Sequence, residues 1–220
     1  FLDAELDNQA YQGVLGNHLF GNVKEGGRID TLKLVEIYRK YLQENNWIRF
    51  EKFNHKDILF ENTSLKYHSL EAAKVIFCEG FGLKKNPYFN HLPLEEVKGE
   101  IITILAPELE IDFLLKSTLF VLPLGNNHYK VGATFNHKDK TSIPSKEGKE
   151  ELIEKLKKVI TVPYSIVEQS AGIRPAVKDR RPMVGVHAKH KQLSVLNGLG
   201  SRGVMIAPTV AKNLFHHLED

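Results

Sequence analysis

The segment Gln192-Leu-Ser-Val-Leu-Asn-Gly-Leu-Gly-Ser-Arg-Gly-Val204 decides the fold class of this 220-residue chain. Its first half is a short apolar run, and its second half is a glycine-rich turn. Apolar residues recur behind the turn at a helical period: Met205, Val210, Leu214 and Phe215. The spacing predicts a strand over Gln192–Leu196 and a helix over Val204–Leu218. A strand that runs through a glycine turn into a helix is typical of α/β proteins.

The turn Gly198–Gly203 also fits the G-x-G-x-x-G fingerprint that binds a dinucleotide pyrophosphate. That fingerprint needs a second parallel strand and an acidic residue about 20 positions later, but the chain ends within one helix. We therefore expect the phosphates elsewhere. Free N–H groups at a helix start suit a delocalised anion, such as the N1–C2=O edge of a reduced flavin. A plain glycine loop at a strand–helix junction is the alternative that the local sequence leaves open.

The composition is that of an ordinary globular protein, with 42% hydrophobic and 26% charged residues. A net charge of +3 is far from the dense basic field of a dedicated nucleic-acid binder. Cys78 is the only cysteine, which excludes an intramolecular disulfide and a multi-cysteine zinc site and fits a reducing compartment. No apolar run approaches bilayer length, and Phe1–Asp7 is acidic. We predict a cytoplasmic protein without membrane contact, and a start at Phe1 suggests an excised domain.

The first half of the chain combines a helix, a meander and a buried strand. The apolar residues from Leu32 to Leu42 recur at a helical period and predict a helix, for which we expect Asp30 to be the cap. Three segments alternate apolar and polar residues, which predicts a small β-meander: Trp47–Phe53, Ile58–Glu61 and Leu65–His68. The apolar run Ala73–Cys78 stops at the glycine turn Glu79–Gly82, as a buried parallel strand does.

The second half favours an antiparallel sheet. Three strand candidates follow Pro93: Val97–Leu105, Ser117–Pro123 and His128–Phe135. Gly125-Asn126-Asn127 joins the last two in a hairpin. Lys146–Ile160 has an apolar stripe under a charged face, which predicts an amphipathic helix with a solvated outer side.

Arg174 stands out because apolar and turn residues surround it in Ala171-Gly-Ile-Arg-Pro175, ahead of Asp179-Arg-Arg-Pro-Met183 and Gly185. An arginine in such a setting usually has a fixed anionic partner. Its planar guanidinium can hold a carboxylate through two parallel hydrogen bonds and so orient an amino-acid substrate. A structural ion pair is the alternative, and the local sequence does not decide between them.

Several motifs together resemble the superfamily of D-amino-acid oxidase and glycine oxidase, which are FAD-dependent oxidoreductases. The order and spacing match for Gly172-Ile-Arg-Pro175, Pro182-Met-Val-Gly185 and the Gly198–Val204 turn with Ala207-Pro208. Other stretches agree: Gly27–Asp30, Val75–Gly80, Leu92–Gly99, Leu119–Pro123 and Tyr129–Thr134. Several weak motifs in the right order are far more specific than one. The resemblance covers nearly the whole chain.

The resemblance implies an α/β fold of mixed α+β character. A partial FAD-binding, Rossmann-like domain is expected from residues 16–92 and 188–220, intertwined with an antiparallel-sheet substrate domain over 93–187. Residues 1–15 would end an upstream excursion. In the family, the first strand and glycine turn hold the ADP half of FAD and lie upstream of Phe1. We therefore expect this fragment alone to lack FAD and to be inactive.

Carried over by position, the family's substrate-carboxylate arginine is Arg174. The residues expected to contact the flavin cofactor are Gly80, Gly82, Gly198, Gly200, Ser201, Arg202, Gly203 and Val204. No metal is expected, because the pairs His187/His190 and His216/His217 lack the spacing of a zinc site. Cys78 is expected to be buried in its strand and to be no nucleophile.

The expected activity is oxidation of the C–N bond of a small amino acid or secondary amine by hydride transfer to the flavin. Two positions depart from glycine oxidase-like members: Phe120 replaces a hydroxylated aromatic, and Ser201 replaces an arginine. Gly200-Ser-Arg-Gly203 is closer to the oxidoreductase domain of bifunctional tRNA wobble-uridine enzymes, which remove a carboxymethyl group from a modified base. A tRNA substrate is therefore the alternative partner. A binding module without flavin or catalysis is the third hypothesis.

Overall fold

The computed structural model describes residues 2–7, 11–15 and 20–219 of the chain. The chain divides into two compact units, each made of two separate stretches. The first unit contains Phe1–Gly26 and Glu96–Arg174, and the second contains Gly27–Glu95 and Pro175–Asp220. Residues 1, 8–10, 16–19 and 220 lie outside the described residues. The expected domain boundary between residues 15 and 16 therefore falls at the edge of a described segment.

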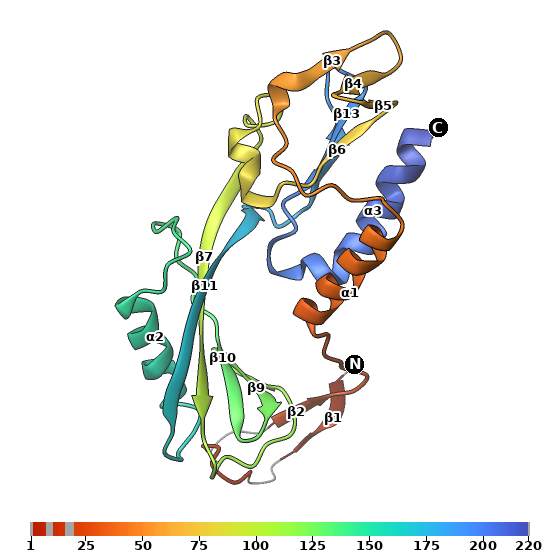
Figure 1. The fold of residues 1–220 in the computed structure, drawn as a ribbon. Helices are drawn as coiled ribbons and strands as arrows, with labels where there is room; N and C mark the ends of the chain where they lie inside the picture. The colour runs from red at the N-terminus through yellow and green to blue at the C-terminus, as the bar shows by residue number, and fades with distance from the viewer. Residues whose placement is uncertain (1, 8–10, 16–19, 220) are drawn as a thin grey trace. The chain divides into compact units, whose positions relative to one another are not determined.

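The first unit is built on a mixed-length sheet in the strand order β11-β7-β10-β9-β8 (Figure 1). The strands are β7 (Leu94–Leu105), β8 (Leu115–Lys116), β9 (Phe120–Gly125), β10 (His128–Gly132) and β11 (Ser165–Val177). β10 pairs antiparallel with both β7 and β9, and β8 pairs antiparallel with β9. The predicted antiparallel sheet is confirmed.

The hairpin between β9 and β10 turns on residues with left-handed backbone. Gly125, Asn126 and Asn127 have φ angles of +95°, +50° and +59°. Asparagine and glycine tolerate this region at low cost, so their presence fixes both the turn and the register of the two strands. The predicted hairpin is therefore confirmed for the reason the sequence gives.

Two further elements complete the first unit. β1 (Leu2–Asp7) pairs antiparallel with β2 (Phe20–Val23). Helix α2 (Lys146–Leu156) begins at Ser145, whose hydroxyl accepts a hydrogen bond from the Gly148 amide at 3.0 Å. Such a cap satisfies one of the free amides of the first turn. The amphipathic helix is confirmed and ends four residues earlier than its apolar pattern suggested.

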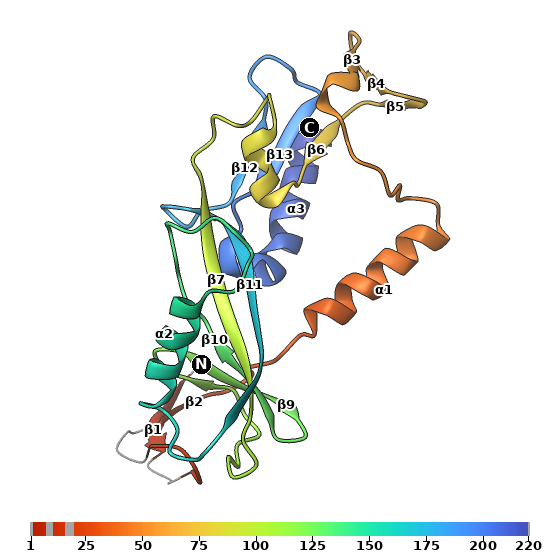
Figure 2. The same ribbon diagram turned by 60° about the vertical axis from the view of Figure 1, so that its left-hand side comes forward.

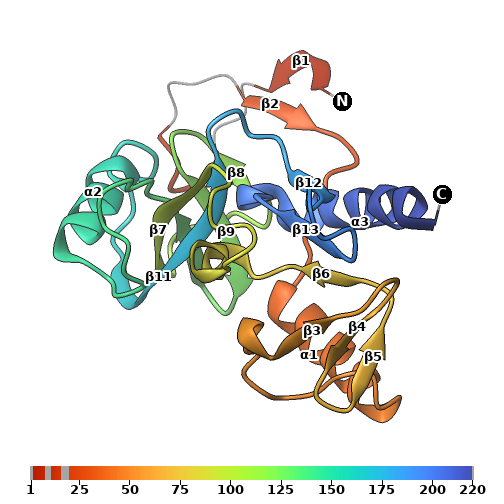
Figure 3. The ribbon, with the colours of Figure 1, turned by 90° about the horizontal axis from the view of Figure 1, so that it is seen from above.

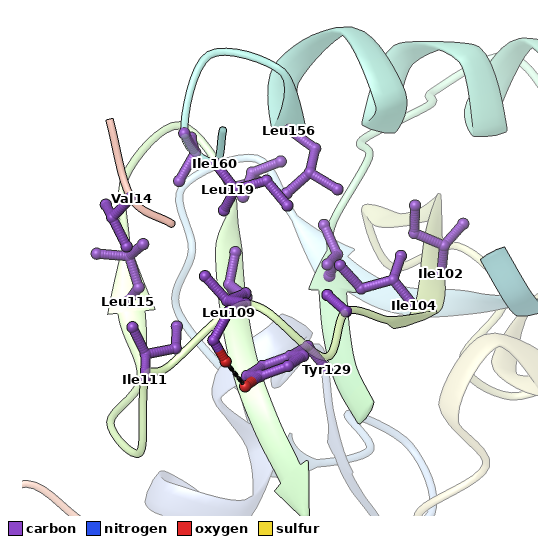
Figure 4. Close-up of a cluster of buried hydrophobic side chains, with 14 of the residues drawn as sticks. Val14, Ile102, Ile104, Leu109, Ile111, Leu115, Leu119, Tyr129, Leu156 and Ile160 are labelled. Atoms are coloured by element: carbon purple, nitrogen blue, oxygen red, sulfur yellow. Dashed lines mark hydrogen bonds between the residues drawn. The ribbon is translucent and has the colours of Figure 1, made fainter. Parts of the chain in front are cut away.

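Figure 4 shows the hydrophobic core of the first unit. β7 contributes Ile102 and Ile104, α2 contributes Leu156, and β10 contributes Tyr129. Each fully buried leucine or isoleucine contributes about 1.5–3 kcal/mol relative to an exposed one. The Tyr129 hydroxyl donates a hydrogen bond to the backbone carbonyl of Leu109, so the one polar atom of that ring is satisfied inside the core.

The second unit contains the predicted parallel strands. β13 (Leu193–Asn197) lies between β6 (Val75–Phe77) and β12 (Met183–Val186), as Figure 3 shows. β13 runs parallel to β6 and antiparallel to β12. Helix α3 (Gly203–Glu219) follows β13 through the glycine turn, which confirms the strand–turn–helix prediction.

A small meander of β3 (Ile58–Phe60), β4 (Leu65–Tyr67) and β5 (Leu70–Ala72) belongs to the same unit. The predicted meander is confirmed in part. Trp47–Phe53 was expected to be its first strand, and this is wrong: the segment contains no strand, and Trp47 is 67% exposed. Alternation produces a strand only where a neighbouring strand supplies hydrogen bonds, and in this sheet β3 pairs with β4 alone, while β5 extends the sheet on the other side of β4.

Helix α1 (Thr31–Glu44) forms where the sequence predicted it (Figure 2). The Asp30 carboxylate accepts a hydrogen bond from the Lys33 amide at 3.0 Å and so caps the helix. None of the helix residues is buried. The apolar stripe has its helical period but no buried residue, and the Tyr41 ring contacts the Trp47 ring edge to face, with 5.9 Å between the ring centroids.

Two further features of the fold differ from the predictions made from the sequence. β11 was not predicted, although it is the strand that carries Arg174; Pro175 within it removes a backbone donor and weakens the strand pattern. Cys78 was expected to be buried, and this is wrong. The strand β6 ends at Phe77, and Cys78 lies exposed just beyond it.

Candidate functional site

The two glycine turns of the second unit lie at the same edge of one sheet. β6 and β13 are parallel neighbours, so their carboxyl ends point the same way and both turns follow there. Asn197, the last residue of β13, joins them. Its side-chain amide donates to the Gly80 carbonyl at 2.9 Å, and its side-chain oxygen accepts from the Gly198 amide at 2.8 Å. The structure thus brings the predicted turns together.

The glycines in these turns serve different needs. Gly198 has φ +71°, and a Cβ there would lie 2.5 Å from a methyl carbon of Val177, so packing alone requires glycine. Gly200 has φ +57°, and a Cβ there would meet nothing within 4 Å. Gly80 also has a left-handed φ, of +56°. The backbone at Gly200 is open on the side where a ligand could approach.

The remaining predicted residues of the turn lie on its surface. Ser201, Arg202 and Val204 are exposed, and Gly203 begins α3. One guanidinium nitrogen of Arg202 donates to the Arg180 carbonyl at 2.7 Å. This bond fixes the turn to the preceding loop and leaves the other donors of Arg202 available.

The turn after β6 is anchored by Glu79. One carboxylate oxygen of Glu79 lies 2.8 Å from Nε2 of His55, and the other accepts from the side-chain amide of Asn86 at 2.7 Å. A cavity of about 540 Å³ opens beside this anchor. It is lined by Lys52, Phe53, Asn54, His55, Glu79, Gly82 and Lys85. The predicted cofactor residue Gly82 therefore borders a cavity that carries two lysines.

Arg174 lies in the first unit as a half-buried cation. Its Nη1 donates to the Thr134 carbonyl at 3.2 Å, and its Cζ lies 4.5 Å from the centre of the Phe135 ring. Burial lowers the pKa of Arg174 below its ordinary value, because a charge loses solvation there. No carboxylate of the described residues lies within ion-pair distance of it. The structural ion pair that the sequence left open is not formed among these residues.

Comparison with known proteins identifies the family to which the chain belongs. A sequence profile of the family described as FAD dependent oxidoreductase (DAO) matches residues 2–216. The chain belongs to this family. The resemblance to FAD-dependent amino-acid oxidases that the motifs predicted is confirmed.

Two relatives show how far this family member resembles characterised enzymes. The tRNA 5-methylaminomethyl-2-thiouridine biosynthesis bifunctional protein MnmC of Idiomarina loihiensis is 31% identical over 161 residues, which are 68% of this chain and 26% of that protein. Glycine oxidase of Bacillus subtilis is 25% identical over 134 residues, 58% of this chain and 36% of that enzyme. The chain thus spans about a quarter to a third of the length of these relatives.

Solved structures share the fold. L-proline dehydrogenase of P. horikoshii matches with a TM-score of 0.66 at 14% identity, over 86% of this chain and 55% of that chain. Glycine oxidase of Bacillus cereus matches with a TM-score of 0.59 at 19% identity, over 74% and 48%. These structures confirm the mixed α/β class with antiparallel sheets, and at such identities the likeness concerns the fold.

Metal sites and membrane spans can be assessed for residues 2–7, 11–15 and 20–219. Within them, no cluster of three or more histidine, cysteine, aspartate or glutamate side chains could hold a metal ion. Among the same residues, no helix combines the length and apolar character needed to cross a bilayer.

The sequence analysis missed the residues that support the predicted ones. Asn197 links the glycine turns, Glu79 anchors the first turn, and Thr134 and Phe135 hold Arg174. An asparagine directly before a glycine at a strand end is a usable signal, because its side chain can bond nearby backbone. Thr134 and Phe135 give no such signal, since they meet Arg174 only through the sheet.

Proposed function

We propose that the protein oxidises the C–N bond of a small amino acid or secondary amine, and that Arg174 binds the carboxylate of that substrate. The observation that carries this proposal is the half-buried guanidinium of Arg174 without a carboxylate partner among the described residues. Holding a desolvated cation in this way is costly unless an anion joins it. A substrate carboxylate would supply that anion and would be oriented by it.

The hydrogen bonding of Arg174 suits a bidentate partner. Nη1 is engaged with Thr134, while Nε and Nη2 donate to no described residue. These two nitrogens lie side by side on one edge of the guanidinium and match the two oxygens of a carboxylate. Such a pairing fixes both the position and the rotation of the substrate, which is the main contribution that orientation makes to catalysis.

We propose that the glycine turns of the second unit contact the cofactor of this family. FAD, when bound, supplies the two-electron oxidation of the α-carbon. We assign its contacts to Gly80, Gly82, Gly198, Gly200, Ser201, Arg202, Gly203 and Val204. The open backbone at Gly200 supports this assignment, as does the cavity beside Gly82 with its two lysines. Gly198 acts through packing, and the amides that begin α3 offer donors to an anionic ring edge.

The domain roles follow from these residues. We propose that residues 16–92 and 188–220 belong to a cofactor domain and 93–187 to a substrate domain, with 1–15 as the end of a preceding excursion. The compact units change at Gly26, Glu95 and Arg174, so the last proposed boundary falls within the second unit, after the strand β12. We also propose a cytoplasmic location.

The test replaces the guanidinium and measures substrate binding in the full-length protein. Arg174→Ala should raise KM for carboxylate-bearing amines about 100-fold, the loss of a charged bidentate contact. Arg181→Ala is the matched control, since Arg181 is exposed in the following loop, and it should leave KM for free amino acids unchanged. An unchanged KM in Arg174→Ala would contradict the proposed role.

A second candidate function is oxidation of a carboxymethylamine group carried on tRNA. The similarity to the MnmC protein supports it, and so does a group of exposed arginines beside the glycine turn: Arg180, Arg181 and Arg202. None of the three has an ion-pair partner among residues 2–7, 11–15 and 20–219. Exposed guanidinium groups without a carboxylate partner can contact phosphates of a nucleic acid.

Anaerobic reduction of the flavin separates the two substrates. The full-length protein is mixed with glycine, sarcosine, D-alanine or tRNA bearing carboxymethylaminomethyluridine, and bleaching of the visible absorbance is followed. Bleaching by the free amino acids alone would remove the tRNA candidate, and bleaching by the tRNA alone would establish it. Full-length protein without flavin absorbance would contradict both and leave a binding module. We expect the chain Phe1–Asp220 by itself to be colourless.

A further inference from the structure

The consecutive residues Lys98, Gly99 and Glu100 of β7 face alternate sides of the sheet. Side chains alternate along a strand, so Lys98 and Glu100 share one face and Gly99 belongs to the other. Lys98 and Glu100 are almost completely buried, with 0% and 1% of their surface exposed. Because Gly99 has no side chain, it leaves space on the face of β7 that is opposite to the buried Lys98 and Glu100 side chains.

The buried face of β7 is held by a closed network. Nζ of Lys98 lies 2.6 Å from the Asp139 carboxylate and 3.4 Å from the Glu100 carboxylate. Glu100 also accepts hydrogen bonds from the hydroxyl and amide of Ser145, at 2.6 and 2.8 Å, and from the Gln169 side chain at 2.9 Å. Fully satisfied networks of this kind are rigid, so the backbone at Gly99 has a defined position.

A neighbouring segment places Phe135 directly across from Gly99. The amide and carbonyl of Lys98 exchange hydrogen bonds with those of Asn136, both at 2.9 Å. The Thr134 amide donates to the Glu100 carbonyl at 3.1 Å. This antiparallel register pairs Gly99 with Phe135, and the two residues face the same side.

The guanidinium of Arg174 fills the space that Gly99 leaves. Arg174 projects from β11, which neighbours β7 in the sheet. A Cβ built on Gly99 would coincide with the guanidinium, since it would overlap Nη2, Cζ and Nη1 of Arg174. The group thus lies across the backbone of Gly99 and reaches the Phe135 ring and the Thr134 carbonyl.

We infer that Gly99 is a positioning residue for Arg174, and that Gly99 and Phe135 together form a notch that fixes the plane of its guanidinium. Gly99 sets where the group lies, and the Phe135 ring adds a cation–π contact. Only a residue without a side chain at position 99 lets the arginine adopt this position. The consequence for substrate binding rests on the proposed function, since the notch presents Nε and Nη2 of Arg174 to a carboxylate.

Thermal unfolding of four forms of the full-length protein tests the notch without reference to activity. Gly99→Ala should lower the Tm by about 4 °C or more, because the new methyl group and Arg174 compete for one space. In an Arg174→Ala background, the same change should cost less than half of that shift, because the space is then empty. A double-mutant cycle isolates such a coupling. Gly172→Ala is the matched control on β11, where a Cβ would meet nothing within 4 Å, and it should leave the Tm unchanged.

An equal loss of Tm in both backgrounds, or no loss in either, would overturn the inference. Phe135→Leu keeps the test decisive if Gly99→Ala does not fold, since Phe135 is 64% exposed and its replacement should be tolerated. It should raise KM for glycine, or for the modified tRNA, about 2–5-fold, the size of an exposed cation–π contact, and leave kcat unchanged. An unchanged KM in Phe135→Leu would likewise overturn it. If the effects of Gly99→Ala and Arg174→Ala on the Tm are coupled but the KM of Arg174→Ala is unchanged, the notch is supported and only the carboxylate-binding role of Arg174 is contradicted.

Discussion

The two faces of β7 around Gly99 hold buried charges in opposite ways. On one face, every charge of the network of Lys98, Glu100 and Asp139 has a partner within the first unit. On the other face, the Arg174 cation is half-buried with a backbone carbonyl and an aromatic ring, and no described carboxylate reaches it. The charges on one face of β7 are thus paired with one another, whereas the cation on the other face has no carboxylate partner among the described residues.

This difference separates structure from a candidate site. In a closed network the charges offset one another's desolvation cost, so removal of one partner lowers the free energy of unfolding. A cation without an anionic partner retains part of its desolvation cost until a ligand binds. Removal of this cation should therefore weaken ligand binding. Changes on the closed face should therefore alter unfolding, and changes on the open face should alter KM.

Loss of Glu100 should have the largest effect on stability. Glu100→Ala removes the acceptor of Ser145 and Gln169 and leaves Lys98 with the Asp139 carboxylate and the Ile143 carbonyl. We expect the free energy of unfolding to fall by about 3–5 kcal/mol, as for other broken buried pairs. Urea denaturation checks this value. Glu150→Ala on the exposed side of α2 is the control and should cost under about 0.5 kcal/mol. Similar losses in both variants would show that the network is not closed.

Loss of Asn197 should cost less and should act on the second unit. Asn197→Ala leaves the Gly80 carbonyl and the Gly198 amide without their partner, which costs about 1–3 kcal/mol of unfolding free energy. The same variant should bind FAD more weakly, because the two turns are no longer joined. Calorimetric melting and flavin titration of the full-length protein measure the two effects. Asn90→Ala, at an exposed position, is the control. Unchanged FAD affinity would mean that the link between the turns does not serve the cofactor.

The closed network also predicts acid sensitivity. The hydrogen bond from Lys98 holds the pKa of Asp139 at about 2, below its ordinary 3.8. The unfolded chain binds this proton first as the pH falls, so the stability from Asp139 is present above pH 3.8 and is lost between about 4 and 2. Urea unfolding across this range should show a shallower pH dependence in Asp139→Asn. Identical slopes in the two proteins would contradict the prediction.

The smallest predicted effect concerns His187 in the second unit. Burial, followed by the charges of His190, His91, Lys189 and Lys191, lowers the pKa of His187 below its ordinary 6.5. The folded state therefore resists protonation, and stability should fall as the pH drops below about 6.5. His187→Asn should flatten this part of the profile, because its side chain does not titrate. A profile with the same slope as that of the unchanged protein would exclude His187 as the group responsible.

The sequence predicted the elements that local chemistry determines. Asp30 capped α1, Asn126 and Asn127 turned the hairpin, and the glycines after Asn197 began the turn to α3. Each depends on backbone preferences that a residue carries with it. The family resemblance added Arg174 as a candidate, and its role stays a prediction.

The missed parts depend on contacts between distant segments. Trp47–Phe53 alternates like a strand but has no partner, and β11 contains Pro175 yet pairs with β7. Cys78 lies one residue beyond the end of its strand and is exposed. In the sequence, Gly99 is only the last residue of a family motif. Its structural role depends on the side chain of Arg174, 75 positions later. Such relations require the register of a sheet, which no local pattern supplies.

Replacement of the open cation by an apolar side chain tests the contrast most directly. Arg174→Leu in the full-length protein removes the charge and retains bulk over Gly99, and both urea unfolding and KM for carboxylate-bearing amines are measured. We predict an unfolding free energy within about 1 kcal/mol of the original, because no ion pair is broken, and a KM about 100-fold higher. A loss of about 3 kcal/mol or more with an unchanged KM would contradict this account and make Arg174 a structural residue.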